Sequence, residues 1–162
     1  MPLKRFTLYN NKLIKPFKKT IKVDSDKSLS IRSFLIGSIS QEISKIDNAL
    51  ESEDVISTIS SLKNLGVKIK KKADKSYLVH GKGLGSLYAK KNLQLNFGNS
   101  GTLARLLIGI LTSTPNIQVR ITGDHSLNKR NMKKLIELMS LFGAEFLPKN
   151  KFNFPLKFIS TE

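Results

Sequence analysis

The sequence predicts a mixed α/β (α+β) fold built from two copies of a βαβαββ unit, with buried helices and outer sheets. The segment LKNLGVKI at 62–69 aligns with MSLFGAEF at 139–146, and an internal repeat of this kind strongly constrains a fold. The predicted strands alternate apolar and polar residues, as sheets do when one face meets water. Residues 103–111 are apolar on nearly every side, which indicates a helix buried on most sides. Periodicity alone also allows an ordinary two-layer α+β sandwich.

The first unit spans about residues 19–84 and begins with alternating residues typical of a strand. Its predicted elements are a strand over 20–23, a helix from about 27, a strand over 43–48, a second helix, and strands over 67–71 and 76–80. The first helix carries apolar residues at helical spacing, namely Leu29, Phe34, Leu35, Ile36 and Ile39. The second helix is expected to start at Ser52, because acidic residues follow this cap in the first turn, and to stop at Gly66.

The second unit spans about residues 92–160 and repeats that order. Its predicted elements are a strand over 93–97, a glycine-bearing turn over 98–102, a helix over 103–111, a strand over 117–121, a helix that includes Met132 to Phe142, and closing strands over 144–147 and 155–159. Gly143 is expected to stop the last helix, as Gly66 does in the first unit. Residues 1–18 are basic and irregular, with one candidate strand over 5–9.

Composition excludes several classes of protein. The 162 residues include no cysteine and two histidines, so the sequence predicts neither a disulfide framework nor a thiolate or histidine metal site. No apolar run approaches the roughly 20 residues that span a bilayer, and the N-terminus lacks the apolar block of a signal peptide, so we expect a cytoplasmic protein. The net charge of +16 suggests nucleic acid, but the lysines are scattered and no aromatic residues are interleaved with them. We therefore expect no nucleic-acid partner.

The most informative motif is DKSLSIR, Asp26 to Arg32, between a strand and a helix. A helix N-terminus has unpaired N–H groups and a positive dipole end, so it attracts anions. Lys27, Ser28 and Arg32 add two charges and a hydroxyl, and the last two lie one turn apart on one helix face. This pattern predicts a phosphate or carboxylate site. The alternative is that Ser28 only caps the helix and that both cations are solvated.

Two further stretches join a strand to a helix in the same way. In FGNSGTLAR, Phe97 to Arg105, the glycines let backbone approach a ligand, although this is also generic turn chemistry. In TGDHSLNKRNM, residues 122–132, Lys129 and Arg130 are expected to enter a helix start, where positive charge is unfavourable without an anion. The alternative for that pair is simple solvation.

Together these stretches resemble the 5-enolpyruvylshikimate-3-phosphate (EPSP) synthase family, also called 3-phosphoshikimate 1-carboxyvinyltransferases. DKSLSIR, GNSGTLAR and GDHSLNKR match in order and spacing, and SEDVISTISSLKNLGVKI and VHGKGLGSL are similar as well. The resemblance implies the inside-out barrel of enolpyruvyl transferases, in which each of two globular halves has three βαβαββ units. It also implies transfer of the enolpyruvyl group of phosphoenolpyruvate to shikimate 3-phosphate, with release of phosphate, on the route to chorismate and the aromatic amino acids.

The resemblance also implies roles for five residues. Lys27 would contact both substrates, Ser28 and Arg32 would hold shikimate 3-phosphate, Gly101 would offer backbone to phosphoenolpyruvate, and Arg130 would bind the phosphate of phosphoenolpyruvate. No metal or organic cofactor is implied, and the full-length protein is expected to be a monomer. Three departures stand out: Asp24-Ser25 replaces the usual Pro-Gly, and Leu106 and Asn131 stand where proline often follows an arginine.

Length is the largest departure from the family pattern. Family members are much longer, residues 1–18 would belong to the other half of the fold, and residues 19–162 would form an incomplete transferase domain. The acid and base of the family, an Asp and a Glu, lie in the other half, so no catalytic residue is expected here. We expect an N-terminal fragment that binds shikimate 3-phosphate weakly and does not turn over. The alternatives are a sister transferase acting on a UDP-sugar, or a non-enzymatic binder of phosphorylated acids or RNA.

Overall fold

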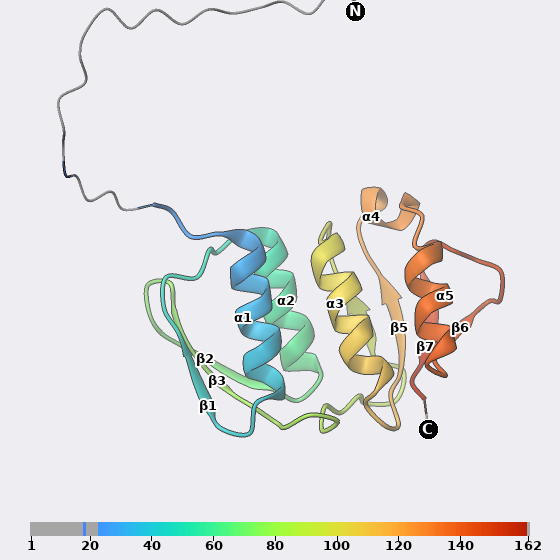
Figure 1. The fold of residues 1–162 in the computed structure, drawn as a ribbon, viewed down its shortest axis with the longest axis horizontal. Coiled ribbons are helices and arrows are strands. Elements are labelled where there is room, and N and C mark those ends of the chain that lie inside the picture. The colour runs from blue at the N-terminus through green and yellow to red at the C-terminus, as the bar shows by residue number, and fades with distance from the viewer. Residues whose placement is uncertain (1–17, 19–22, 162) are drawn as a thin grey trace, which may run out of the picture.

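The computed structural model describes Lys18 and residues 23–161. Figure 1 shows its elements, which in chain order are α1 (Lys27–Ile39), β1 (Ile43–Ile46), α2 (Glu53–Asn64), β2 (Lys68–Ala73), β3 (Ser76–His80), β4 (Gln94–Asn96), α3 (Gly101–Thr112), β5 (Gln118–Thr122), α4 (His125–Lys129), α5 (Lys133–Leu141), β6 (Glu145–Leu147) and β7 (Leu156–Ile159). The predicted strand over 5–9 lies outside the described residues, and so does all but the last residue of the one over 20–23.

Two sheets with related topology confirm the repeat. The first has the order β1-β3-β2 and the second the order β4-β5-β7-β6. In each sheet the last strand of the unit lies in the middle, antiparallel to both neighbours. Strand β4 extends the second sheet as the parallel partner of β5, with Leu95 opposite Ile121.

The two units also end a helix in the same way. The N–H of Val67 donates to the carbonyl of Leu62 at 3.0 Å, and the N–H of Gly66 to Lys63 at 3.0 Å. Residues 77 positions later repeat both bonds: Ala144 donates to Met139 and Gly143 to Ser140, at 3.1 and 3.0 Å. This pair of bonds is the Schellman motif, and it needs a left-handed residue, here glycine with φ of +87° and +91°.

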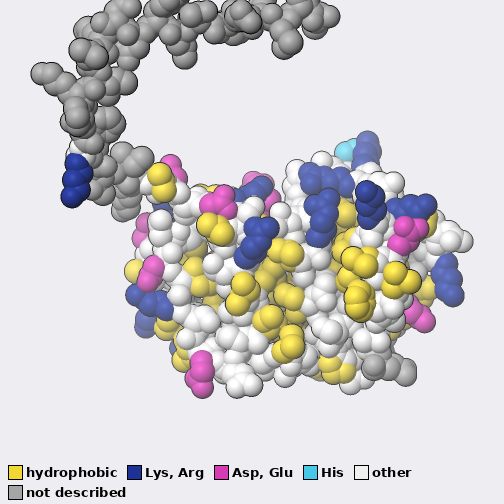
Figure 2. Space-filling model, viewed as in Figure 1, with side chains coloured by type: hydrophobic (Ala, Val, Ile, Leu, Met, Phe, Trp, Pro, Cys, Tyr) yellow, Lys and Arg dark blue, Asp and Glu magenta, His cyan; other side chains and the backbone are white. Residues whose placement is uncertain are grey.

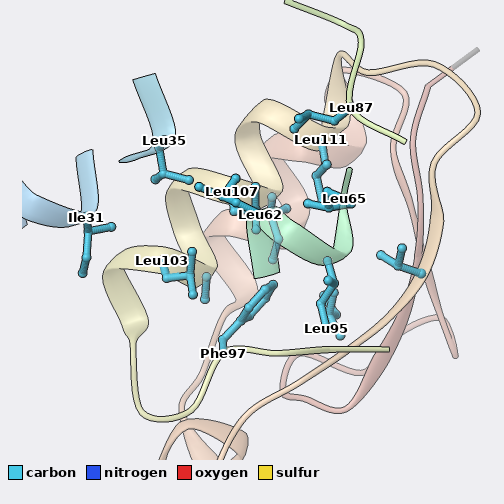
Figure 3. Packing of buried hydrophobic residues seen from close by; sticks show 14 of the residues in the cluster. Ile31, Leu35, Leu62, Leu65, Leu87, Leu95, Phe97, Leu103, Leu107 and Leu111 are labelled. Atoms are coloured by element: carbon cyan, nitrogen blue, oxygen red, sulfur yellow. The ribbon is translucent and has the colours of Figure 1, made fainter. Parts of the chain in front are cut away.

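One apolar core joins the units. Helix α1 packs against both α2 and α3, and the three begin at the same end of the molecule (Figure 1). Figure 3 shows Leu35 of α1, Leu62 of α2 and Leu107 of α3 meeting over Leu95 and Phe97 from the strand β4 segment, all fully or almost fully buried. The alternating strands turn their polar residues away from this core, so the sheets form an outer layer, as predicted, and the helices bury the sides that face them.

Burial of the helices is incomplete in this chain. Leu29 and Ile36, two of the apolar residues at helical spacing in the first helix, are each 65% exposed, and Leu106 of α3 is 36% exposed. These residues lie on the side of the helix layer away from the sheets. Figure 2 shows hydrophobic side chains at the surface over α1, α3 and α5.

The prediction of a single last helix that begins near Lys129 is wrong, because the chain forms two helices there, α4 and α5. Arg130 has an extended conformation, with φ of −69° and ψ of 137°, and it ends α4 before α5 begins at Lys133. Lys129 and Arg130 therefore lie at a helix C-terminus, where positive charge is favourable, and not at the helix start that the sequence suggested. The dipole argument for a ligand beside these two residues fails.

No helix in the described residues is long and apolar enough to cross a membrane.

Candidate anion-binding site

The starts of α1, α2 and α3, together with Arg130 at the end of α4, supply the candidate site. Asp26 caps α1 by accepting a hydrogen bond from the N–H of Leu29 at 2.7 Å, and Ser100 caps α3 by accepting from Leu103 at 3.3 Å. Asp124 caps the short α4 through the N–H of Leu127 at 2.7 Å. These caps explain why polar residues precede each helix, and they hold the flanking side chains in place.

A hollow of about 320 Å³ lies where these elements meet. Its lining combines three cations with two carboxylates and polar residues from the start of α3: Lys27, Glu53, Asp54, Asn99, Gly101, Thr102, Arg105 and Arg130. Figure 2 shows Lys and Arg side chains gathered at this end of the molecule, near α3 and α4. Backbone N–H groups at the start of α3 add to the positive potential.

Lys27 is held by an acidic partner from another helix. Its ammonium lies 2.9 Å from a carboxylate oxygen of Asp54, whose side chain is 16% exposed. Asp54 belongs to the first turn of α2, where the helix dipole stabilises a carboxylate. The pair therefore fixes the ammonium at the edge of the hollow, and the free energy of the ion pair itself is small at this exposure.

Arg130 is held by Asn99, which belongs to the turn before α3. Its guanidinium donates to the side-chain oxygen of Asn99 at 2.5 Å, and the N–H of Asp124 donates to the carbonyl of Gly98 at 2.8 Å. The α4 loop is therefore joined to the turn before α3 at two points. Arg105 lies beside Arg130 and donates to the carbonyl of Gly101 at 3.3 Å.

Gly101 allows these guanidinium groups to approach the helix start. A Cβ atom at this position would lie 3.0 Å from Arg130 Nη1 and 3.2 Å from Arg105 Nη1. Two positive groups thus converge on one backbone position, which is the arrangement that a phosphate or carboxylate would satisfy.

Of the five residues predicted from sequence, Lys27, Gly101 and Arg130 line the hollow, whereas Ser28 and Arg32 do not. Ser28 is partly buried and Arg32 is exposed, both on α1. Asp54, Asn99 and Arg105 also line the hollow but were not among the predicted substrate-binding residues. From sequence, Asn99 was a candidate helix cap and Arg105 was placed one turn into the helix after the glycine-bearing turn. The repeat offered a signal for Arg105, which corresponds to Arg32, whereas the contacts of Asp54 and Asn99 depend on tertiary packing.

Asn131, which replaces the usual proline, has its own structural role. Its side-chain oxygen accepts a hydrogen bond from the N–H of Lys133 at 2.8 Å. Asparagine thus satisfies one of the free N–H groups at the start of α5, whereas proline favours a helix start through its fixed φ.

The fold and the hollow define a class: α/β proteins with repeated units that can bind anions where helices begin. A sequence model described as EPSP synthase (3-phosphoshikimate 1-carboxyvinyltransferase) matches residues 12–160. The chain belongs to this family.

Individual relatives agree with that assignment. The chain is 37% identical over 145 residues to the 3-phosphoshikimate 1-carboxyvinyltransferase of Syntrophomonas wolfei, covering 90% of this chain and 33% of the relative. It is 41% identical over 138 residues to that of Vesicomyosocius okutanii, covering 85% of this chain and 31% of the relative. A solved EPSP synthase from Acinetobacter baumannii superposes with a TM-score of 0.78 at 33% identity, covering 88% of this chain and 32% of that structure. The chain thus spans about a third of the length of these proteins.

Proposed function

We propose that this chain carries the shikimate 3-phosphate site, and part of the phosphoenolpyruvate site, of an enolpyruvyl transferase. In the proposed reaction the 5-hydroxyl of shikimate 3-phosphate adds across the C2–C3 double bond of phosphoenolpyruvate, with its oxygen bonding to C2 and a proton to C3. The C2–O bond to phosphate then breaks with loss of a C3 proton, which restores the double bond and releases inorganic phosphate. The observation that carries the proposal is the convergence of Lys27, Arg105 and Arg130 on the start of α3. We further propose a cytoplasmic location.

Different residues would bind each of the two anionic substrates. Arg130, held by Asn99, would bind the phosphate of phosphoenolpyruvate beside the backbone of Gly101. Lys27 would lie between the two substrates, with Asp54 fixing its ammonium. Ser28 and Arg32, outside the hollow on α1, would hold shikimate 3-phosphate. Each charge-assisted hydrogen bond contributes about 1.5–3 kcal/mol, so several of them suffice for specific binding.

We propose that this chain alone binds without turning over. The resemblance implies that the acid and base of the family belong to the other half of the fold, and the chain spans about a third of its relatives. A phosphate-release assay with both substrates tests this directly, and steady release of phosphate from the purified 162-residue chain would contradict it.

Calorimetric titration with shikimate 3-phosphate tests the binding proposal. Replacing Arg32 by Ala should weaken binding about tenfold or more, since one charge-assisted bond is lost. The matched control is Lys70→Ala on β2, which removes one exposed charge that does not line the hollow and should leave the affinity unchanged. Equal losses in both variants would indicate attraction by net charge alone. Tighter binding of a UDP-sugar or of RNA would instead favour the sister transferase or a binding module.

A further inference from the structure

A second basic concavity lies on the outer face of the second sheet. It is a groove of about 1140 Å³ bounded by the segment before β4, the turn before β5 and the connection between β6 and β7. Its lining includes the cations Lys90, Lys91, Arg120, Lys151 and Lys157, and no aspartate or glutamate. In a chain with 12 acidic residues, this segregation produces a strong local positive potential.

The strand register places two of these cations side by side. Arg120 on β5 is the direct antiparallel partner of Lys157 on β7, and both are exposed between buried neighbours, so both point outward. Like charges directly opposite on a sheet are destabilising. Within residues 23–161 neither cation has an ion-pair partner. Glu145 on β6 also points outward, but its partner on β7 is Ile159 and not Lys157. An anion bound between Arg120 and Lys157 would remove the repulsion.

Other groups around the groove suit an anion as well. The Lys151 ammonium donates to the carbonyl of Pro155 at 2.9 Å, which fixes it at the edge of the groove with two N–H groups still available. Gln94, the partner of Arg120 on β4, and Gln118 add amide donors. The cations therefore come from four segments that the fold holds in place.

The lining also limits the kind of ligand. No aromatic side chain lines the groove, so bases of a nucleic acid would have no surface on which to stack. The groove is larger than most small-molecule sites, which are about 300–1,000 Å³, so a single phosphate would not contact all five cations.

The groove is separate from the candidate site at the helix starts. It lies at the N-terminal ends of the parallel strands β4 and β5, whereas the turns that begin at Gly98 and Gly123 follow their C-terminal ends. We propose that this groove binds an oligophosphate, a ligand with several phosphate groups in a row, independently of the transferase substrates.

Titration of the whole chain with sodium tripolyphosphate at about 0.1 M salt tests the proposal, because the Debye length is then only about 10 Å. The double variant Arg120→Gln/Lys157→Gln should bind at least about tenfold more weakly. The matched control is Lys70→Gln/Lys72→Gln, which removes two exposed charges from β2 of the other sheet and should change the affinity less than about twofold. Equal losses in the two double variants would overturn the proposal.

Two further measurements fix the location and the ligand. Tripolyphosphate should shift the backbone NMR signals of 90–94 and 147–157 and should raise the unfolding temperature of the wild type more than that of the Arg120/Lys157 variant. Retained binding in Arg130→Ala is expected, and its loss would move the ligand to the helix starts and overturn the proposal. So would tight binding of single-stranded RNA without binding of tripolyphosphate.

Discussion

At Gly101 the missing side chain leaves room for two guanidinium groups beside the start of α3. Replacing Gly101 by Ala would push Arg130 Nη1 and Arg105 Nη1 outward by a few tenths of an ångström, because both would contact the new methyl group. These are flexible side-chain ends, so we predict little change in stability. Affinity for phosphoenolpyruvate should fall about tenfold, the equivalent of about 1.4 kcal/mol.

Gly109→Ala is the matched control in the same helix. A Cβ atom there would meet nothing within 4 Å, so this variant should gain about 0.5–1 kcal/mol in unfolding free energy and keep its affinity. Titration and urea unfolding of both variants check the pair. Unchanged affinity in Gly101→Ala would contradict the proposed place of Arg130 in the site.

Tyr77 ties the loop before α2 to the first sheet. Burial, and then the hydrogen bond that its hydroxyl donates to Glu51 at 2.6 Å, raise the pKa of Tyr77 from 10.0 to about 12. A group with a raised folded pKa stabilises the native state below its unfolded pKa, and this stability is lost as the pH rises from 10 to about 12.

We predict that Tyr77→Phe removes the part of the loss in unfolding free energy at alkaline pH that comes from this hydroxyl. The difference in unfolding free energy between the wild type and this variant should narrow between pH 10 and about 12, as measured by urea unfolding. Tyr88→Phe serves as the matched control, since it removes the hydroxyl of a tyrosine that is 62% exposed. A constant difference across this range would contradict the role of the hydroxyl.

At the scale of elements, the repeated helix stop allows a matched comparison between the two units. Gly66 and Gly143 both have positive φ, and a non-glycine residue there costs roughly 1–2 kcal/mol. A Cβ atom at Gly66 would meet nothing within 4 Å, whereas one at Gly143 would lie 2.6 Å from Thr161 Oγ1. Gly143→Ala should therefore lower the unfolding free energy more than Gly66→Ala. Equal losses measured by urea unfolding would show that the Thr161 contact relaxes without cost.

Local patterns predicted most elements well, because their causes lie within a few residues. The strand over 76–80 and both glycine stops are confirmed, and Ser100 caps α3 from the polar turn that the sequence predicts before that helix. Asp124, expected in a turn, instead caps the short helix α4. The break between α4 and α5 was missed, since Arg130 is extended without glycine or proline to signal it. Its position depends on Asn99, 31 residues away, and no local pattern carries such a contact.

At the scale of the molecule, the exposed face of the helix layer is the main feature that the sequence did not predict residue by residue. Helices α1, α3 and α5 leave apolar side chains open: Leu29, Ile36, Leu106, Leu138 and Leu141. Helical spacing shows which apolar residues share one side of a helix. Whether that side is buried depends on the element that packs against it, and residues 23–161 contain no element that covers this face. The family resemblance implies three units in each globular half, and this chain forms about two of them.

We predict concentration-dependent association through this face, since large apolar patches mark interaction surfaces. Ile36→Glu should shift sedimentation velocity profiles toward the monomer, because it places a charge in the patch. Leu84→Glu is the control, as Leu84 is 72% exposed in the connection between the units. A wild-type chain that stays monomeric at high concentration, or equal effects of both variants, would contradict the prediction.

The central claim is that the helix starts of this chain form an anion site for shikimate 3-phosphate. The most direct test is an NMR titration of the labelled chain with shikimate 3-phosphate, following each backbone amide. We predict saturable shifts confined to 26–32, 98–105 and the neighbourhood of Arg130, and we expect Arg32→Ala to need about tenfold more ligand to reach the same shifts. Shifts that map instead to the groove on the second sheet, or no saturable shift at any concentration, would contradict the claim.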